Sequence, residues 1–190
     1  MVPVAWALSC PAPFEGWEPP PDGVLPANGE VVWIAESGRF PESGAFFVQA
    51  DGVTMLGTEA DVEPRTSDTY ALVPHEPLLP GVVYAPGFTP GDLPDLDLPE
   101  SPIVRAQRFE SSGGWSGQPQ DRVHFDIEGV EARVELEITE GSGPTHRIAA
   151  FGETSFGQSD CNTRPDAYLV GAALTVRARN VDWAGNTSEW

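Results

Sequence analysis

The chain has 190 residues and a formal net charge of −19 at pH 7, with ten basic residues, all of them arginine. So acidic a chain is repelled by nucleic acid and by anionic membrane surfaces, because both are bound mainly through basic side chains. The lack of lysine also excludes P-loop, pyridoxal-type and kinase chemistry, which each need one. Forty per cent of the residues are hydrophobic, enough for a folded core, and the 20 glycines and 20 prolines favour short strands joined by turns.

Residues 1–21 predict a signal-peptide remnant followed by a proline-rich leader. The first ten residues are largely apolar and contain Ala-Trp-Ala at residues 5–7, the small-x-small pattern that signal peptidase reads. The Ala-Leu-Ser-Cys sequence that ends at Cys10 resembles a lipobox with its leucine one position late, so lipidation of Cys10 is the alternative. The prolines that follow remove amide donors and keep the chain extended, so we expect this leader to lie along a sheet edge.

Residues 22–98 predict a first β-sandwich. Asn28-Gly29 is a turn signal, and Asp51-Gly52 marks a tight hairpin between two short apolar runs. Short strands with no helical period between them are typical of a small sandwich. The expected strands cover residues 31–35, 45–50, 53–58 and 69–73, and a further strand follows residues 78–84 until Pro86 interrupts it.

Residues 86–102 predict an extended linker, because proline recurs through them, and we place the domain boundary near Pro99. This linker is also acidic. Its carboxylates come from Asp92, Asp95, Asp97 and Glu100. Carboxylate oxygens are the ligands that Ca²⁺ prefers, so these side chains either bind a structural calcium ion between two domains or are simply solvated.

Residues 99–190 predict a second β-sandwich with clearer alternation. In residues 121–127 and 133–139, apolar and polar side chains alternate with a period of two, which is typical of a half-buried antiparallel strand. The inward residues are Val123, Phe125 and Ile127 in the first run and Val134, Leu136 and Ile138 in the second. Further strands are expected at residues 103–109, 146–151 and 174–179, and a last strand starts at residues 187–190.

Two segments resemble known domain families. The pattern Leu-x-Pro-Gly-x-x-Tyr that ends at Tyr84 resembles the segment of fibronectin type III and bacterial immunoglobulin-like domains in which a tyrosine folds back as a tyrosine corner. With Pro-Ala-Asn-Gly at residues 26–29, the first domain is similar to the Ig-like domains of bacterial S-layer and other surface proteins. Residues 174–188 are similar to the last hairpin of bacterial fibronectin type III-like repeats, although Leu174 stands where a tyrosine is expected. The resemblance implies two tandem antiparallel β-sandwiches and specifies function hardly at all.

The chain has two cysteines, Cys10 and Cys161, and neither belongs to a CxxC or Cys/His metal motif. A single pair in an acidic, proline-rich chain fits a disulfide formed in an oxidising compartment, so we predict a Cys10–Cys161 bond. In the chain-entropy model, closing so long a loop stabilises the fold by about 5 kcal/mol. The alternative is a free buried thiol at Cys161 and a cysteine in a mobile tail at Cys10.

The sequence shows no serine-nucleophile or histidine-based catalytic motif, and its many carboxylates leave a glycosidase pair as the only open enzymatic alternative. The three histidines are His75, His124 and His146, and no two of them have the spacing of a metal motif. We therefore predict that the protein is not an enzyme. Trp115 lies among small polar residues of a loop, where it either stacks on a sugar ring or a partner, or folds back over the end of the sandwich.

These features predict a non-catalytic secreted or cell-surface module of an exported bacterial protein, acting as a structural spacer or as an adhesion or protein-binding unit. The alternative function is a carbohydrate-binding accessory module that uses Trp115. The expected partner is a protein or a cell-surface glycan. We expect no nucleic acid, no cofactor apart from the candidate calcium ion and, because no run of 18 apolar residues occurs, no membrane span.

Overall fold

The computed structural model describes residues 15–17, 19–35, 45–48, 57–66, 68–85, 87–111, 120–158 and 173–190. These residues contain β-strands and no helix, so the fold class is all-β, as the alternating pattern predicts. It follows that this part of the chain holds no helix long and apolar enough to cross a membrane. We call residues 15–90 the first unit, residues 91–102 the linker and residues 103–190 the second unit.

The first unit is built on a five-stranded antiparallel sheet with the order β1-β3-β6-β5-β4, and β2 and β7 form a separate short parallel pair. Its strands are β1 (Glu15–Gly16), β2 (Val24–Leu25), β3 (Val31–Ala35), β4 (Ala45–Val48), β5 (Gly57–Pro64), β6 (Thr69–Pro74) and β7 (Thr89–Pro90). β1, which lies within residues 1–21, occupies the sheet edge beside β3, and the leader itself stays a prediction.

The strand pair β4–β5 is antiparallel along the full length of β4, which agrees with the predicted hairpin, although its turn at residues 51–52 lies outside the described residues. β5 runs on to Pro64 instead of ending at Thr58. The strand is longer because apolar Ala60 and Val62 alternate with the acidic residues around them. This period of two continues the strand, and Ala60 on its inner face is buried.

Aromatic rings fill the core of the first unit. Phe88 is fully buried, with its ring centroid 5.0 Å from that of Trp17 in an edge contact and 5.8 Å from that of Tyr84 in a stacked one. The Tyr84 hydroxyl accepts a hydrogen bond from the backbone N–H of Leu79 (3.0 Å), so this tyrosine does fold back toward the residues before it. Instead of a strand after Tyr84, the chain makes a single bridge from Tyr84 to Phe88.

The second unit consists of two antiparallel three-stranded sheets, with the orders β12-β9-β8 and β11-β10-β13. Its strands are β8 (Ile103–Ser111), β9 (Gln120–Glu128), β10 (Arg133–Glu140), β11 (Thr145–Ala150), β12 (Thr154–Gln158) and β13 (Leu174–Val181). All but β12 match a predicted strand to within two residues. The predicted last strand is reduced to one bridge between Thr187 and Val181.

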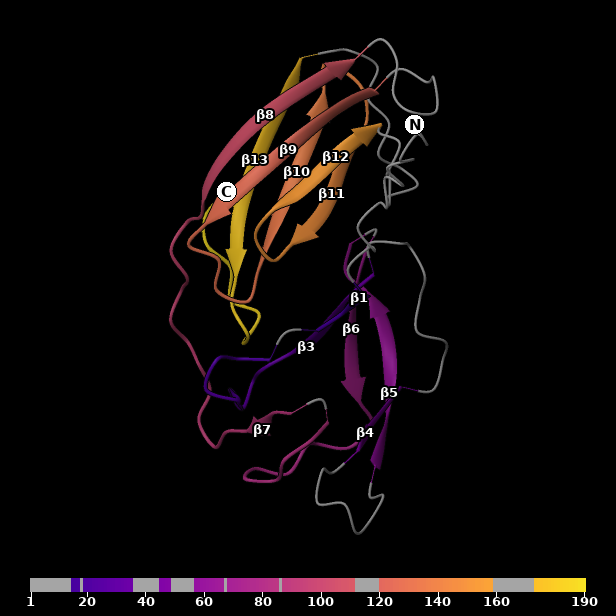
Figure 1. Cartoon of the computed structure of the whole chain (residues 1–190). Helices are drawn as coiled ribbons and strands as arrows, with labels where there is room; N and C mark the ends of the chain where they lie inside the picture. The colour runs from indigo at the N-terminus through magenta and orange to yellow at the C-terminus, as the bar shows by residue number, and fades with distance from the viewer. Residues whose placement is uncertain are drawn as a thin grey trace, which may run out of the picture.

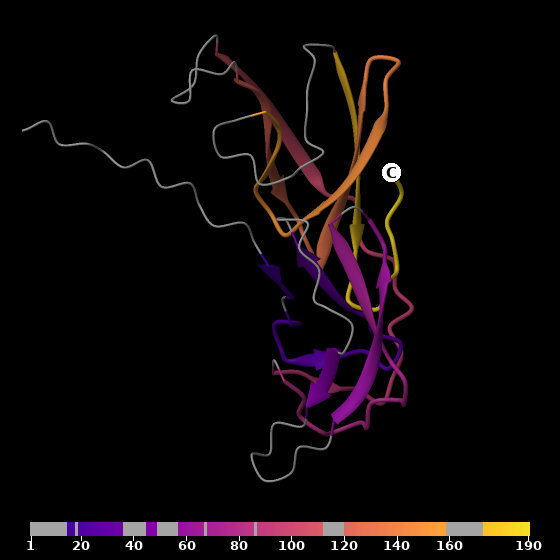
Figure 2. The ribbon, with the colours of Figure 1, turned by 90° about the vertical axis from the view of Figure 1, so that its right-hand side faces the viewer.

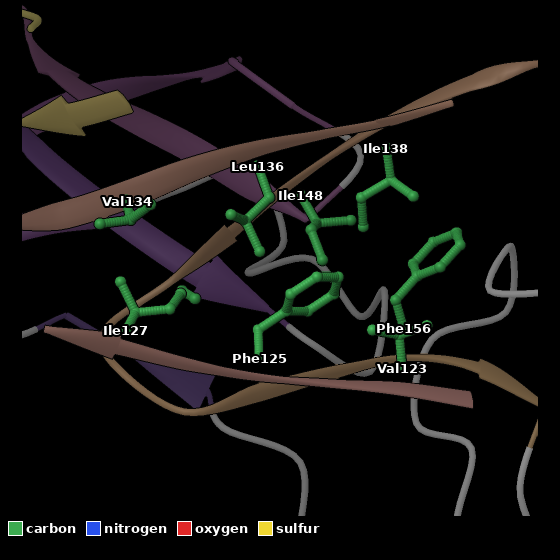
Figure 3. Close-up of a cluster of buried hydrophobic side chains, with 9 residues drawn as sticks. Val123, Phe125, Ile127, Val134, Leu136, Ile138, Ile148 and Phe156 are labelled. Atoms are coloured by element: carbon green, nitrogen blue, oxygen red, sulfur yellow. The ribbon is translucent and has the colours of Figure 1, made fainter. Parts of the chain in front are cut away.

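The core of the second unit lies between its two sheets. The buried side chains of β9 and β12 point toward those of β10 and β11, as Figure 3 shows. These core residues are Val123, Phe125, Ile127, Val134, Leu136, Ile138, Ile148, Ala150 and Phe156. Burying one large apolar side chain stabilises a fold by about 1.5–3 kcal/mol, so the inward residues predicted from the alternation hold these two sheets together.

The two units are stacked end to end, and residues 91–102 run along one side as a linker without regular secondary structure (Figure 1). The view turned by 90° shows the same stacking, with the facing sheets of the second unit above the first unit (Figure 2). The ends of the two units therefore meet in a junction.

Candidate functional site

Three of the predicted site residues, Cys10, Trp115 and Cys161, lie outside the described residues. The Cys10–Cys161 disulfide and the exposed tryptophan therefore stay predictions. The four proposed calcium ligands of the linker are described, and the structure places each of them.

The linker acids are mostly turned to solvent. Asp92, Asp97 and Glu100 are exposed, whereas Asp95 is half-buried. The Oδ1 atom of Asp95 accepts the backbone N–H of Asp97 (3.1 Å), so part of its carboxylate is occupied within the linker. Among the described residues, no three His, Cys, Asp or Glu side chains are grouped as a metal site requires. Calcium binding stays a prediction, without a formed set of ligands in this part of the chain.

Asp95 fastens the linker to both units through its backbone. Asn28 of the first unit donates from Nδ2 to the Asp95 carbonyl oxygen (2.9 Å) and accepts the Asp95 N–H at Oδ1 (2.9 Å). Asn186 of the second unit donates to the same carbonyl oxygen (3.1 Å). Asn186 is itself held by Asp182, whose carboxylate accepts its side-chain amide (2.9 Å) and its backbone N–H (2.8 Å). One linker residue thus connects the two units.

The C-terminal end of the linker is held by Asn180, a fully buried residue of β13. Its side-chain amide donates to the carbonyl oxygens of Glu100 (2.8 Å) and Gly129 (2.6 Å). Its backbone N–H donates to Ser188 Oγ (2.9 Å). The sequence carried a signal for this role that we did not use, because Asn180 occupies an inward position of an alternating strand and a buried amide must be hydrogen-bonded.

A buried carboxylate joins the two units directly. Asp68, which is 4% exposed, accepts at Oδ1 the backbone N–H of Ala149 in the second unit (3.2 Å) and the hydroxyl of Thr66 (2.8 Å). The Asp68 carbonyl oxygen accepts the N–H of Ala35 (2.8 Å), which fixes the residue beside β3. Because a buried charge is stable only when hydrogen-bonded, these contacts hold the start of β6 against β11.

Glu30 lies between arginines of the two units. Arg65 of the first unit donates to its carboxylate from Nε (3.1 Å) and Nη2, and Nη2 of Arg133 in the second unit lies 3.8 Å from Glu30 Oε2. The Glu30 backbone N–H donates to the carbonyl oxygen of Trp183 (2.9 Å). Burial lowers the pKa of Arg133 below its ordinary value, and the carboxylates of Glu135 and Glu30 oppose that shift. Glu30 therefore offsets part of the cost of a buried cation in the junction.

Trp183 carries an apolar contact across the same junction. It lies in the turn that follows β13, and this turn is fixed by Asp182, whose Oδ1 accepts the N–H of Ala184 (2.8 Å). The indole packs against the core of the first unit, which consists of Leu25, Val31, Ala60, Tyr84 and Phe88. A large ring inserted beside the core of the neighbouring unit resists sliding and rotation between the units.

Glu131 places a further carboxyl group near the linker. Burial raises the pKa of Glu131 above its ordinary value, and the charges of Asp182, Asp95 and Glu100 add to this shift, while a backbone hydrogen bond with Glu100 opposes it. At neutral pH the junction therefore contains like charges that repel one another. Protonation of Glu131 relieves that repulsion.

The outer face of the sheet β11-β10-β13 carries a cross-strand ladder of arginines over glutamates. Arg147 donates to Glu137 from Nε (3.0 Å) and Nη2 (2.9 Å), Arg177 donates to the same carboxylate from Nε (3.1 Å), and Arg179 donates to Glu135 from Nε (2.9 Å). The hydrogen bonds from Arg177 first, and then from Arg147, lower the pKa of Glu137 below its ordinary value. The two glutamates that the alternation predicted to face solvent are on the outer face but lie covered by arginine side chains.

Trp190 lies across the arginines of this ladder. Its ring centroid is 4.5 Å from Cζ of Arg179, 5.3 Å from that of Arg177 and 6.0 Å from that of Arg147. A guanidinium within about 6 Å of an indole ring is attracted by the ring quadrupole. The C-terminal residue thus rests on the outer face of β13.

The described histidines have neighbours of different kinds. His75 is exposed, with Nε2 3.0 Å from Oδ1 of Asp61, and the hydrogen bond to Asp61 is the main cause that raises the pKa of His75. His124 Nδ1 lies 3.2 Å from Ser155 Oγ, and the ring of His146 lies against Phe156 with the centroids 5.1 Å apart. His75 follows β6, His124 lies on β9 and His146 on β11.

The chain matches no protein-family model, no curated protein and no solved structure. The junction joins the two units through the linker, through the buried carboxylate of Asp68 and through the indole of Trp183.

Proposed function

We propose that the chain is a non-catalytic structural module of an exported or cell-surface protein, in which two tandem β-sandwiches are held at a fixed spacing and present their loops and sheet edges to a protein partner. The single observation that carries this proposal is the junction, above all the buried hydrogen bond from Ala149 to Asp68. A flexible pair of domains needs no such contact, since linkers alone connect it.

The same proposal assigns an immunoglobulin-like sandwich to the first unit and a fibronectin type III-like sandwich to the second. The contact of the Tyr84 hydroxyl with Leu79 supports the first assignment, and the two facing sheets of the second unit support the second. Export is supported by the acidic, lysine-free composition and by the signal-like pattern near the N-terminus.

Small-angle X-ray scattering tests the spacer role with two tryptophan variants. Trp183→Ala removes the indole from the junction, so we expect a larger maximum dimension and a flexibility signature in the scattering curve. Trp190→Ala removes an indole from the outer face of the second unit and is the matched control, for which we expect the wild-type curve.

Calorimetry on the same proteins checks whether the units act together. We expect one unfolding transition for the wild type and the control, and two for Trp183→Ala, because the units then unfold separately. Identical scattering curves and single transitions for all three proteins contradict the spacer proposal.

A further inference from the structure

One side of the second unit is open. β8 is the edge strand of one sheet and β13 is the edge strand of the other, and a groove of about 390 Å³ lies between them. Its lining includes Val104 and Ala106 of β8, Val176 to Ala178 of β13, and Trp190 at the C-terminus.

The small apolar residues of this lining belong to the inner faces of their strands but are not buried like the rest of the core. Val104, Val176 and Ala178 pack against the core cluster and remain half-buried, and Ala106 is exposed. By contrast, Phe125 and Leu136 in the middle strands are fully buried. Within the described residues, the second unit therefore leaves apolar surface uncovered along one side, which is the surface that an additional strand covers when it joins a sheet edge.

The backbone along this side is also available within the described part of the chain. β13 pairs through residues 174–181 with β10. On its other side, Asn180 and Val181 have backbone partners in Ser188 and Thr187, and the ring of Trp190 lies over the side chains of Arg177 and Arg179. The stretch 174–179 contains no proline and no charged residue at an inward position, so it lacks the usual devices that protect an edge strand from pairing.

Charge restricts what can pair with this edge. The carboxylates of Glu135 and Glu137 are covered, with side chains 12% and 8% exposed, whereas the side chains of Arg147 and Arg177 above Glu137 are 61% and 54% exposed. The outer face next to β13 therefore presents guanidinium groups, although the chain as a whole carries a charge of −19. A strand with acidic side chains on that face complements it.

The same charges argue against a second copy of this chain as the occupant. Two β13 strands paired with each other would bring the rows formed by Arg177 and Arg179 together, and like charges that face each other across strands are destabilising. The net charge of each copy adds a long-range repulsion.

We propose that the groove between β8 and β13 binds an extended strand of a partner protein in which small apolar residues alternate with acidic ones. The partner backbone pairs with residues 174–179 of β13. Its apolar side chains enter the groove against Ala106 and Ala178, and its acidic side chains lie on the outer face beside Arg177. This inference rests on the protein-binding part of the proposed function and is independent of the spacer part.

Titration with synthetic peptides, followed by NMR chemical shifts of the backbone amides, tests this site. The probe is a capped peptide of about nine residues, roughly one strand, in which valine and glutamate alternate. We expect saturable shifts that concentrate on residues 174–179 of β13 and on residues 103–107 of β8. A peptide of the same composition with its valines grouped together, and one with lysine in place of glutamate, are expected to bind at least about tenfold more weakly, because they lose the alternation or the charge match.

Two variants on β8 locate the binding surface. Ala106→Asp places a charge in the groove, and we expect it to weaken binding of the alternating peptide by about tenfold or more. Gln107→Asp adds the same charge on the other face of the strand and is expected to leave binding unchanged. Both positions are exposed, so neither variant removes a core side chain.

Several results would overturn the proposal: no binding of the alternating peptide, equal binding of the grouped or lysine peptide, or equal loss of binding in the two variants. Sedimentation analysis can also overturn it. If the wild type forms a dimer and Ala106→Asp dissociates that dimer, the groove binds a second copy of this chain. If the peptide does not bind, the scattering test of the spacer role is unaffected. If the scattering shows a flexible junction, the peptide result is unaffected, so the two proposals can fail separately.

Discussion

The carboxylate of Asp68 accepts a hydrogen bond from the backbone N–H of Ala149, 81 residues further along the chain. Both groups are buried, and they belong to different units. This contact therefore depends on the two units being docked, and it gives docking a measurable energy.

Replacing Asp68 by alanine leaves the buried Ala149 N–H without its acceptor. We expect Asp68→Ala to lower the free energy of unfolding by about 1.5–3 kcal/mol, the range for hydrogen bonds to charged groups. Asp68→Asn keeps the Oδ1 acceptor and is expected to cost less. Urea denaturation at pH 7 measures both values, and an Asn variant as unstable as the Ala variant would show that charge matters more than this hydrogen bond.

Replacing Tyr84 by phenylalanine removes only the hydroxyl that accepts the Leu79 N–H, since the ring keeps its stacking on Phe88. We expect a loss of about 1 kcal/mol in unfolding free energy. Tyr84→Ala, which also removes the ring from the core, is expected to cost about 3–5 kcal/mol by analogy with phenylalanine. Thermal unfolding of the two variants separates the contribution of the hydroxyl from that of the ring. If Tyr84→Phe is as stable as the wild type, the hydroxyl contact does not stabilise the fold.

The stability that Glu137 contributes depends on pH. Arg177 and Arg147 hold its pKa below the ordinary value in the folded protein, so its contribution is present above the ordinary pKa of a glutamate and is lost as the pH falls through the lower folded value. We therefore expect Glu137→Gln to lower the urea midpoint at pH 7, and expect the difference from wild type to be smaller at about pH 3, below the ordinary pKa of a glutamate. Glu153→Gln, at an exposed position, controls for the change in net charge. An effect that is equal at both pH values contradicts the ion-pair explanation.

The contribution of Glu131 to stability changes with pH in the opposite direction to that of Glu137. Burial and the neighbouring acids raise its pKa in the folded protein, so its protonated form is favoured by folding, and the benefit is present at low pH and lost as the pH rises through the folded pKa. We expect Glu131→Gln to stabilise the protein at pH 7, by less than about 1 kcal/mol because the carboxyl group is only partly removed from solvent and its charge is screened. The gain should disappear below about pH 4, where the carboxyl is protonated in both states. Denaturation curves over this pH range measure it, and destabilisation at pH 7 would contradict the repulsion inferred here.

The strands that the sequence located best are those in which apolar and polar residues alternate over several positions. β9, β10 and β13 follow the predicted ranges because each presents three apolar side chains to one face. β12 was missed because Phe156 is its only large apolar residue, and one side chain does not establish a period. Its place in the sheet comes from its pairing with β9.

The candidate site was located less well. The linker acids were identified as a group of carboxylates, yet the functional feature of Asp95 is its backbone, which Asn28 and Asn186 bind. These asparagines lie 67 and 91 positions from Asp95, so no local pattern connects them with it. Trp183 packs against the core of the first unit, a contact that no local sequence pattern predicts.

The sequence by itself determined that this protein is built of sheets and which side chains of the second unit face inward, because the period of two is a property of the local backbone and its neighbours. Only the tertiary structure decided which strands lie at the open edge, that the glutamates of β10 lie covered by arginines, and that the two units dock through Asp68 and Trp183. These relations join residues far apart in the chain, and their energies exist only once the backbone has brought them together.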